Sequence, residues 1–344
     1  MARSMEDYDE SDVRIRPNRR GSRPRSKDRP AHADAVPGRV VGVDRGRYTT
    51  IVEDSSGGHV ALAMRARELG RKGIVVGDHV HLVGDVSGDD GSLARIVRVS
   101  PRRTVLRRTA DDTDPVERVL VANADQLVVV CALADPEPRP RMIDRCLVAA
   151  YDAGMEPLLV LTKADLADPV PFLQQYAPLS LSHVVTARAC GPTTGLEELR
   201  RALSGRVSVL VGHSGVGKST LVNELVPDAA RATGVVNDVT GRGRHTSTSA
   251  VSLALPGDSG WVIDTPGVRS FGLAHVDPAR IVTHFRDLEP GTAACPRGCT
   301  HDEEECALDA WVESGSAGAS GPSRLDSLRR LLRTRSSALA SDKP

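Results

Sequence analysis

The sequence predicts a multidomain chain in which an all-β barrel of the OB type precedes an α/β domain and a small α-helical module. Three observations carry this prediction. Short strand patterns alternate with turn residues in the first third, strand and helix patterns alternate from residue 126, and three cysteines and a histidine lie within residues 295–306. A chain of 344 residues is too long for one ordinary core, so two or three domains are expected. We place them at residues 37–103, 104–275 and 276–344, after a tail over residues 1–36.

The tail over residues 1–36 shows no apolar periodicity and separates its charges. Acidic residues cluster between Glu6 and Asp12, and basic residues broken by prolines follow between Arg14 and Arg29. Such a composition is typical of a disordered segment. Two interpretations remain open: a solvated tail, or a basic arm that contacts RNA phosphates without reading their sequence.

Composition restricts the partners and the compartment. The formal net charge is zero, so a polyanionic partner would have to contact local basic patches. The longest apolar run, Leu127–Ala134, is far shorter than the ~20 residues of a membrane-spanning helix, and the first residues lack the apolar core of a signal peptide. We therefore expect a cytoplasmic protein without a membrane partner. There thiols stay reduced, which favours metal binding or packing over disulfides for the six cysteines.

The barrel is predicted from strand patterns that glycine- and aspartate-containing turns separate. The expected strands are 39–43, 48–52, 59–64, 79–83 and 93–99. Five short strands of this kind suit an OB-type barrel. Barrels of this type often bind oligonucleotides, but the fold alone does not establish RNA binding.

The α/β domain is predicted from alternating strand and helix patterns that follow a polar, charged connector over residues 102–115. The expected strands are 126–133, 157–161, 184–186, 207–211 and 260–263, and a helix is expected over 141–153. This alternation indicates a mainly parallel sheet with helices on both faces.

A glycine-rich turn separates the strand at 207–211 from a helix. The turn fits the phosphate-loop pattern G-x-x-x-x-G-K-S/T, and the residues in and directly after it are Gly212, His213, Ser214, Gly215, Val216, Gly217, Lys218, Ser219 and Thr220. In such a loop backbone N–H groups close around phosphate oxygens, which side chains would obstruct. We expect Lys218 to neutralise the β- and γ-phosphates and Ser219 to ligate Mg²⁺.

A second part of a nucleotide site follows the next expected strand, where Asp264 begins an Asp-Thr-Pro-Gly turn. An acid at a strand end can hold the Mg²⁺ shell, and the N–H of Gly267 can approach a γ-phosphate because no side chain intervenes. The polar loop over residues 241–248 stands where a switch segment belongs. Thr246 or Thr248 would complete the Mg²⁺ coordination.

Hydrolysis also needs a group that orients water. Val268 stands where Ras-like enzymes carry a water-positioning glutamine, and valine cannot orient water. We therefore expect slow intrinsic turnover that a partner or His245 of the polar loop completes. The alternative is that His245 is a loop residue without a chemical role.

The stretch Thr162-Lys163-Ala164-Asp165 follows an apolar strand and fits a base-reading motif. The Asp165 carboxylate can accept hydrogen bonds from N1–H and the 2-amino group of guanine, whereas adenine has no donors in that arrangement. The Lys163 stem can pack across the base. Thr162 replaces the usual asparagine and loses an amide donor, which is expected to weaken base affinity.

Two further residues, Thr186 and Ala187, are expected to close over the guanine edge with backbone N–H groups. They and the base-reading motif precede the phosphate loop, whereas the phosphate loop comes first in Ras-like GTPases. A circularly permuted P-loop GTPase domain would assemble the same site, because chain termini often lie close together on a domain surface. Permutation also places the switch after Asp264 directly before the C-terminal module, which the γ-phosphate state could then move.

The C-terminal module contains a set of potential metal ligands: Cys295, Cys299, His301 and Cys306. Three thiolates and one imidazole form a structural zinc set, and four protein ligands leave no open catalytic position. The alternative is a metal-free cluster of exposed thiols. Residues 323–333 are expected to form a basic amphipathic helix whose arginine face either contacts RNA or is solvated.

Taken with these motifs, the chain resembles the ribosome small-subunit-dependent GTPases of the RsgA family. The residues that carry the resemblance are the cysteine and histidine set and the ranges 122–126, 144–148, 212–219, 243–246 and 264–272. The resemblance implies an OB-fold, a circularly permuted GTPase and a zinc domain. It also implies binding of GTP and GDP, binding to the maturing small ribosomal subunit and its rRNA, and GTP hydrolysis that this particle stimulates. A monomer is expected.

The chain departs from the family pattern at Thr162 and in a zinc-ligand spacing that is one residue tighter in two intervals. Two other functions compete with the leading one. A P-loop ATPase or kinase would prefer ATP over GTP. A non-enzymatic RNA-binding scaffold with a structural nucleotide would keep its function after Lys218→Ala.

Overall fold

A computed structural model describes residues 32–53, 58–70, 73–109, 117–188, 191–227, 250–265, 276–319 and 321–340. The chain divides into two units, Met1–Ala33 and Asp34–Pro344, and the second is described below. The predictions for residues 1–31 lie outside the described residues. So do those for His245, Thr246, Thr248, Gly267 and Val268.

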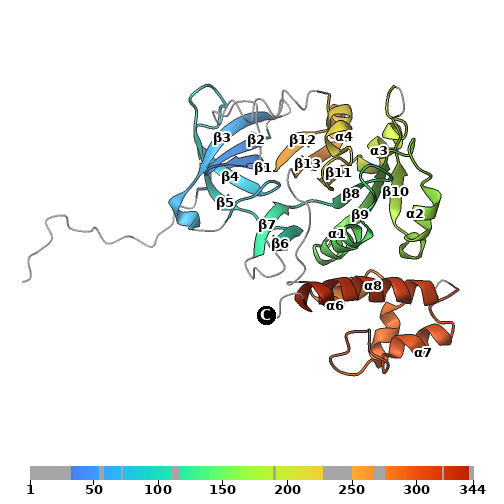
Figure 1. Ribbon diagram of the computed structural model, residues 1–344. Coiled ribbons are helices and arrows are strands. Elements are labelled where there is room, and N and C mark those ends of the chain that lie inside the picture. The colour runs from blue at the N-terminus through green and yellow to red at the C-terminus, as the bar shows by residue number, and fades with distance from the viewer. Residues whose placement is uncertain are drawn as a thin grey trace, which may run out of the picture. The chain divides into compact units, whose positions relative to one another are not determined.

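Five strands form the barrel of Figure 1. They are β1 (Val36–Asp44), β2 (Arg47–Val52), β3 (His59–Arg65), β4 (His79–Gly84) and β5 (Ala94–Val99), and the short 3-10 helix η3 (Arg67–Leu69) follows β3. The pairings run β1-β2-β3-β5-β4, and β4 pairs back to β1, which closes the barrel. Val40, Leu82 and Ile96 are fully buried in its interior. The predicted OB-type barrel is confirmed, with each expected strand in place.

The predicted connector over residues 102–115 is wrong in its first half. Strands β6 (Val105–Thr109) and β7 (Glu117–Ala122) pair as an antiparallel ribbon. Leu106 and Val121 are fully buried in the main core, while Arg107 is exposed. Side chains of a strand alternate between its two faces, so Leu106 can be buried while its charged neighbour is exposed. The charged residues around Leu106 hid this alternation in the sequence.

The α/β domain contains a largely parallel sheet in the order β10-β9-β8-β11-β13-β12. Its strands are β8 (Gln126–Ala132), β9 (Glu156–Thr162), β10 (Ser182–Val185), β11 (Arg206–Val211), β12 (Val251–Ala254) and β13 (Gly260–Asp264). Its helices are α1 (Pro140–Asp152), α2 (Val170–Gln174), α3 (Leu196–Leu203) and α4 (Lys218–Leu225), with 3-10 turns η4 (Ala177–Leu179) and η5 (Pro256–Asp258). The predicted helix and strands of this domain are confirmed.

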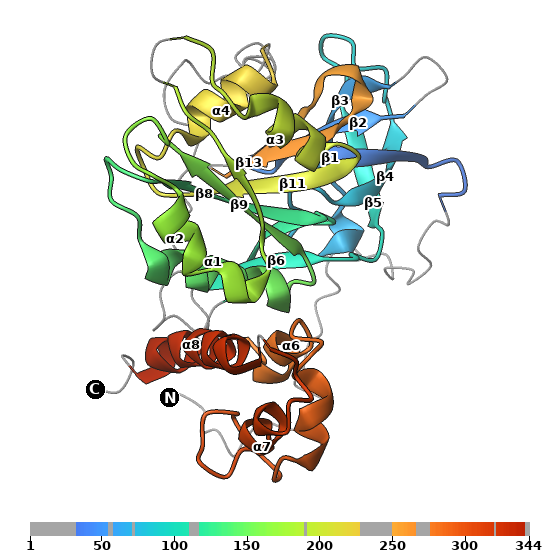
Figure 2. The same ribbon diagram turned by 90° about the vertical axis from the view of Figure 1, so that its right-hand side faces the viewer.

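Helices cover both faces of this sheet, as predicted (Figure 2). All seven residues of β8 are buried. Leu127 and Val129 pack in the cluster that contains α1, whereas Val128 and Val130 pack with α3 and α4. This alternation explains why β8 is apolar throughout: each successive side chain meets a helix on the opposite face.

Strand β12 is an element that the sequence did not indicate. It pairs antiparallel with β13 and, through Val251 opposite Gly42, with β1 of the barrel. The strands of the barrel and of the parallel sheet therefore form one continuous sheet of eleven hydrogen-bonded strands.

The C-terminal module comprises α6 (Pro278–Val282), the 3-10 helix η6 (Glu289–Ala294), α7 (Ala307–Glu313) and α8 (Gly321–Ala340). Leu328 and Leu331 of α8 are fully buried in the same cluster as Ile143 and Leu147 of α1. The module thus shares its core with the α/β domain. Across the described residues, no helix combines the length and apolar character needed to cross a membrane.

The predicted basic helix over 323–333 is confirmed, and four of its arginines make contacts within the chain that the sequence did not reveal. Each forms an ion pair with an aspartate of the chain: Arg324 with Asp287, Arg329 with Asp309, Arg330 with Asp144, and Arg333 with Asp302. Three of these ion pairs lie within the C-terminal module, and the pair of Arg330 with Asp144 joins α8 to α1.

Candidate nucleotide site and metal cluster

The phosphate-loop residues connect β11 to α4 in a conformation that requires glycine. Gly215 and Gly217 have φ values of 82° and 91°, a left-handed region in which side chains are strained. A Cβ on Gly212 would lie 2.6 Å from the carbonyl oxygen of Val130. Because α4 begins at Lys218, the unpaired N–H groups of its first turn face the loop, as an anion site requires.

Lys218 and Asp264 meet at the carboxyl end of the sheet. The Lys218 ammonium donates a hydrogen bond to Asp264 Oδ1, and their side chains are 12% and 25% exposed. Leu210 of β11 is paired with Asp264 of β13, and the Thr265 hydroxyl donates to the Leu210 carbonyl at 2.7 Å. This contact fixes the strand end that carries the carboxylate. Ligands of open α/β sheets bind at this edge.

The donor set at this edge fits magnesium in part. Mg²⁺ prefers carboxylate, hydroxyl and phosphate oxygens, and Ser219 in the first turn of α4 and Asp264 supply the first two. Thr246 and Thr248, the two candidates for the third ligand, lie outside the described residues.

A cavity of about 260 Å³ joins the base-reading motif to the phosphate loop. Its lining residues are Thr162, Lys163, Asp165, Leu166, Thr186, Ala187, Arg188, Thr193, Gly217, Thr220 and Leu221. The structure thus brings together residues that the chain order separates, as the permutation predicts. Leu166, Arg188, Thr193 and Leu221 were missed as site residues. Arg188 directly follows the predicted Thr186-Ala187 pair, and Leu221 directly follows the predicted Thr220.

Backbone contacts hold the base-reading loop. Asp165 Oδ1 accepts a hydrogen bond from the N–H of Arg188 at 3.0 Å, and the N–H of Ala164 donates to the Thr186 carbonyl at 3.1 Å. Lys163 has a φ of 58°, and its ammonium donates to the Asp135 carbonyl. The carboxylate and the segment after β10 are therefore positioned together.

Thr162 makes a contact that the sequence did not reveal. Its hydroxyl donates to the carbonyl oxygen of Val216 at 2.6 Å, and the residue is 5% exposed. The residue that replaces asparagine in the base-reading motif therefore contacts the phosphate loop.

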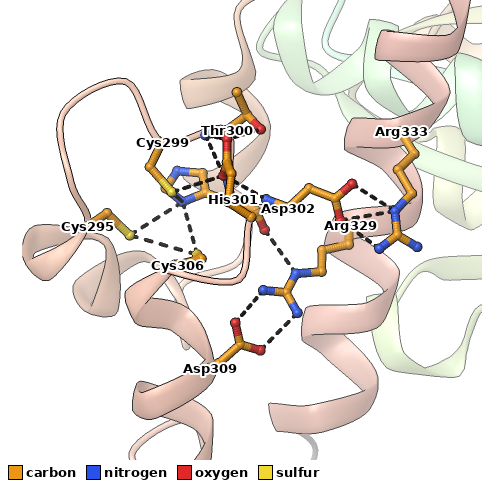
Figure 3. A network of polar contacts seen from close by, with 10 residues as sticks. Cys295, Cys299, Thr300, His301, Asp302, Cys306, Asp309, Arg329 and Arg333 are labelled. Carbon is orange, nitrogen blue, oxygen red and sulfur yellow. Dashed lines mark hydrogen bonds and ion pairs between the residues drawn. The ribbon is translucent and has the colours of Figure 1, made fainter.

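Cys295, Cys299, His301 and Cys306 converge in the C-terminal module (Figure 3), with their ligand atoms within 4.8 Å of one another. The Sγ atoms of Cys295 and Cys306 are 4.0 Å apart. The Nδ1 atom of His301 lies 3.6, 3.7 and 3.8 Å from the Sγ atoms of Cys295, Cys299 and Cys306, respectively. A tetrahedral Zn²⁺ with Zn–S of about 2.3 Å requires about 3.8 Å between sulfurs and about 3.6 Å from sulfur to nitrogen. The cluster fits a metal ion of this kind.

Two further cysteines of the described residues lie outside the cluster. Cys131 and Cys146 are buried free thiols, as expected of packing residues, and burial raises the pKa of Cys146 to about 12. Cys190 lies outside the described residues.

The fold and this site define a P-loop GTPase whose motifs occur in circularly permuted order. A model of the RsgA GTPase family matches residues 99–274. The chain is 37% identical over 268 residues to the small ribosomal subunit biogenesis GTPase RsgA of Chromohalobacter salexigens, covering 76% of this chain and 75% of the relative. It is 40% identical over 254 residues to the RsgA of Pseudomonas aeruginosa, with 72% of each chain covered. The chain belongs to the RsgA GTPase family and is a GTP hydrolase.

Solved structures agree with this assignment. YjeQ from Thermotoga maritima superposes with a TM-score of 0.63 at 27% identity, covering 88% of this chain and 98% of that one. YloQ, described as a circularly permuted GTPase, superposes with a TM-score of 0.62 at 20% identity, covering 92% and 99%. The second likeness supports the fold.

Proposed function

We propose that this GTPase acts in the late maturation of the small ribosomal subunit. It binds the particle and its rRNA, and it hydrolyses GTP to GDP and phosphate with stimulation by the particle. The observation that carries the GTP site is a cavity that residues of both the base-reading motif and the phosphate loop line. The names of the relatives support the choice of particle.

The proposed roles follow from the positions of the side chains. Asp165, held by the Arg188 N–H, accepts from guanine, and Thr186 and Ala187 line the same cavity. Lys218 binds the β- and γ-phosphates once these replace its contact with Asp264. Ser219 and Asp264 hold Mg²⁺, and Thr246 or Thr248 completes the set.

Catalysis is proposed to depend on the particle. Gly267 contacts the γ-phosphate, and Val268 cannot orient water. His245 or a group of the particle supplies the missing function, so intrinsic turnover is slow.

The cysteine and histidine cluster is proposed to hold one structural Zn²⁺, because four protein ligands close the coordination shell. We also propose domain boundaries after residues 36, 103 and 275, a cytoplasmic location and a monomeric state.

The decisive experiment is GTP turnover by the purified protein with and without isolated small ribosomal subunits. Strong stimulation by the small subunit and little by the large one is expected, and Lys218→Ala abolishes turnover. Brisk turnover that neither particle changes would point to a free-standing NTPase. Normal subunit maturation with Lys218→Ala would point to the non-enzymatic scaffold. Inhibition of GTP turnover by competing ATP would point to an ATPase.

A further inference from the structure

The hydroxyl of Thr162 joins the two halves of the nucleotide site. Thr162 ends β9, and its Oγ1 lies 2.6 Å from the carbonyl oxygen of Val216, which is 54 residues away in the sequence. A second acceptor, the Cys131 carbonyl, is at 3.5 Å, too long to compete. Because a threonine hydroxyl has one donor hydrogen, Thr162 has no donor left for the base.

The contact acts on the peptide between Val216 and Gly217. In a planar trans peptide the C=O and the following N–H point in opposite directions. A hydrogen bond that fixes the Val216 carbonyl toward Thr162 therefore turns the Gly217 N–H away from Thr162. Gly217 precedes the first residue of α4 and has a φ of 91°, so it belongs to the turn whose N–H groups surround phosphate.

We propose that Thr162 is a positioning residue for the phosphates of the nucleotide and has no part in selecting its base. This inference rests on the proposed GTP site. Without the hydroxyl, the Val216–Gly217 peptide loses its buried partner and samples other orientations. If the competent orientation is populated about a tenth of the time, the apparent dissociation constant rises about tenfold.

The test uses the full chain and three probes: GDP, inorganic tripolyphosphate and guanosine. Thr162→Val keeps the shape of the side chain and removes the donor. The variant is expected to lower the affinities for GDP and for tripolyphosphate by the same factor, about tenfold. The affinity for guanosine and the preference for GDP over xanthosine diphosphate stay unchanged, and Thr162→Ser keeps wild-type affinities.

Asp165→Asn is the matched control for the base. This variant is expected to bind GDP more weakly, to prefer xanthosine diphosphate over GDP and to leave tripolyphosphate binding unchanged. An unchanged GDP affinity in this variant would refute the proposed guanine site. The tripolyphosphate measurements would still test Thr162 by themselves.

Two outcomes overturn the inference: wild-type tripolyphosphate affinity in Thr162→Val, or a loss of guanosine affinity as large as the loss for GDP. If Thr162→Val does not fold, Thr162→Ser and Thr162→Ala replace the comparison, because they differ by the hydroxyl alone. Equal tripolyphosphate affinities in that pair would also reject it.

Discussion

Arg330 of α8 lies 3.2 Å from the carboxylate of Asp144 in α1, whose side chain is 5% exposed. The guanidinium also stacks on the Tyr176 ring, with 5.1 Å between its central carbon and the ring centroid. One residue earlier, Arg329 pairs with Asp309 and donates to the carbonyl of His301 at 2.9 Å. Two consecutive arginines thus connect the loop that carries His301 to α1 of the α/β domain.

Arg330→Met is expected to destabilise the protein by about 3 kcal/mol, because it leaves the Asp144 carboxylate buried without its ion pair. Chemical denaturation of purified protein measures this loss. Arg333→Met, in an ion pair whose arginine is 58% exposed, serves as the control and should cost less than about 1 kcal/mol. Equal losses in the two variants would contradict the role of the buried pair.

His284 is expected to make the stability of the folded protein depend on pH. Its ring stacks on Tyr151 of α1 at 4.3 Å. Burial lowers its pKa below the ordinary 6.5, assisted by Arg286, while the Tyr151 carbonyl opposes this shift. The folded state therefore takes up a proton less readily than the unfolded state, and stability present above pH 6.5 is lost as pH falls through the folded pKa.

His284→Phe keeps an aromatic ring against Tyr151 and removes the titration. The free energy of unfolding of the wild type should fall relative to that of the variant as pH is lowered from 7.5 to about 5. A difference that stays constant over this range would reject the assignment to His284.

Local patterns predicted most of the fold, and partners distant in sequence account for the rest. The barrel strands were predictable because turn residues flank alternating apolar positions. Strand β12 was missed since four residues carry too little periodicity. The helical pattern of α8 and its charged residues were predictable from the sequence. The sequence around Arg330 does not indicate that this residue pairs with Asp144. Likewise the sequence showed that Thr162 is not asparagine, but not the carbonyl, 54 residues away, that its hydroxyl meets.

Cys299→Ser is expected to remove one metal ligand and with it most of the bound zinc, because a structural site needs its full tetrahedral set. Metal content per chain, measured by atomic emission, checks this outcome, and thermal unfolding should shift to lower temperature. Cys131→Ala, outside the cluster, should keep stoichiometric zinc. Full zinc content in Cys299→Ser would contradict the ligand set.

The contact between Lys218 and Asp264 predicts how magnesium affects nucleotide binding. Phosphates must displace Asp264 from Lys218, and Mg²⁺ gives the carboxylate a new partner. Asp264→Ala should therefore bind GDP more tightly than the wild type in EDTA, by about fivefold if the ion pair is worth about 1 kcal/mol. The same variant should lose the gain in affinity that Mg²⁺ confers on the wild type. Lys218→Ala, the control, should bind weakly in both conditions, and GDP titrations with and without Mg²⁺ measure all three proteins. Weaker binding of Asp264→Ala in EDTA would show that the contact does not compete with phosphate.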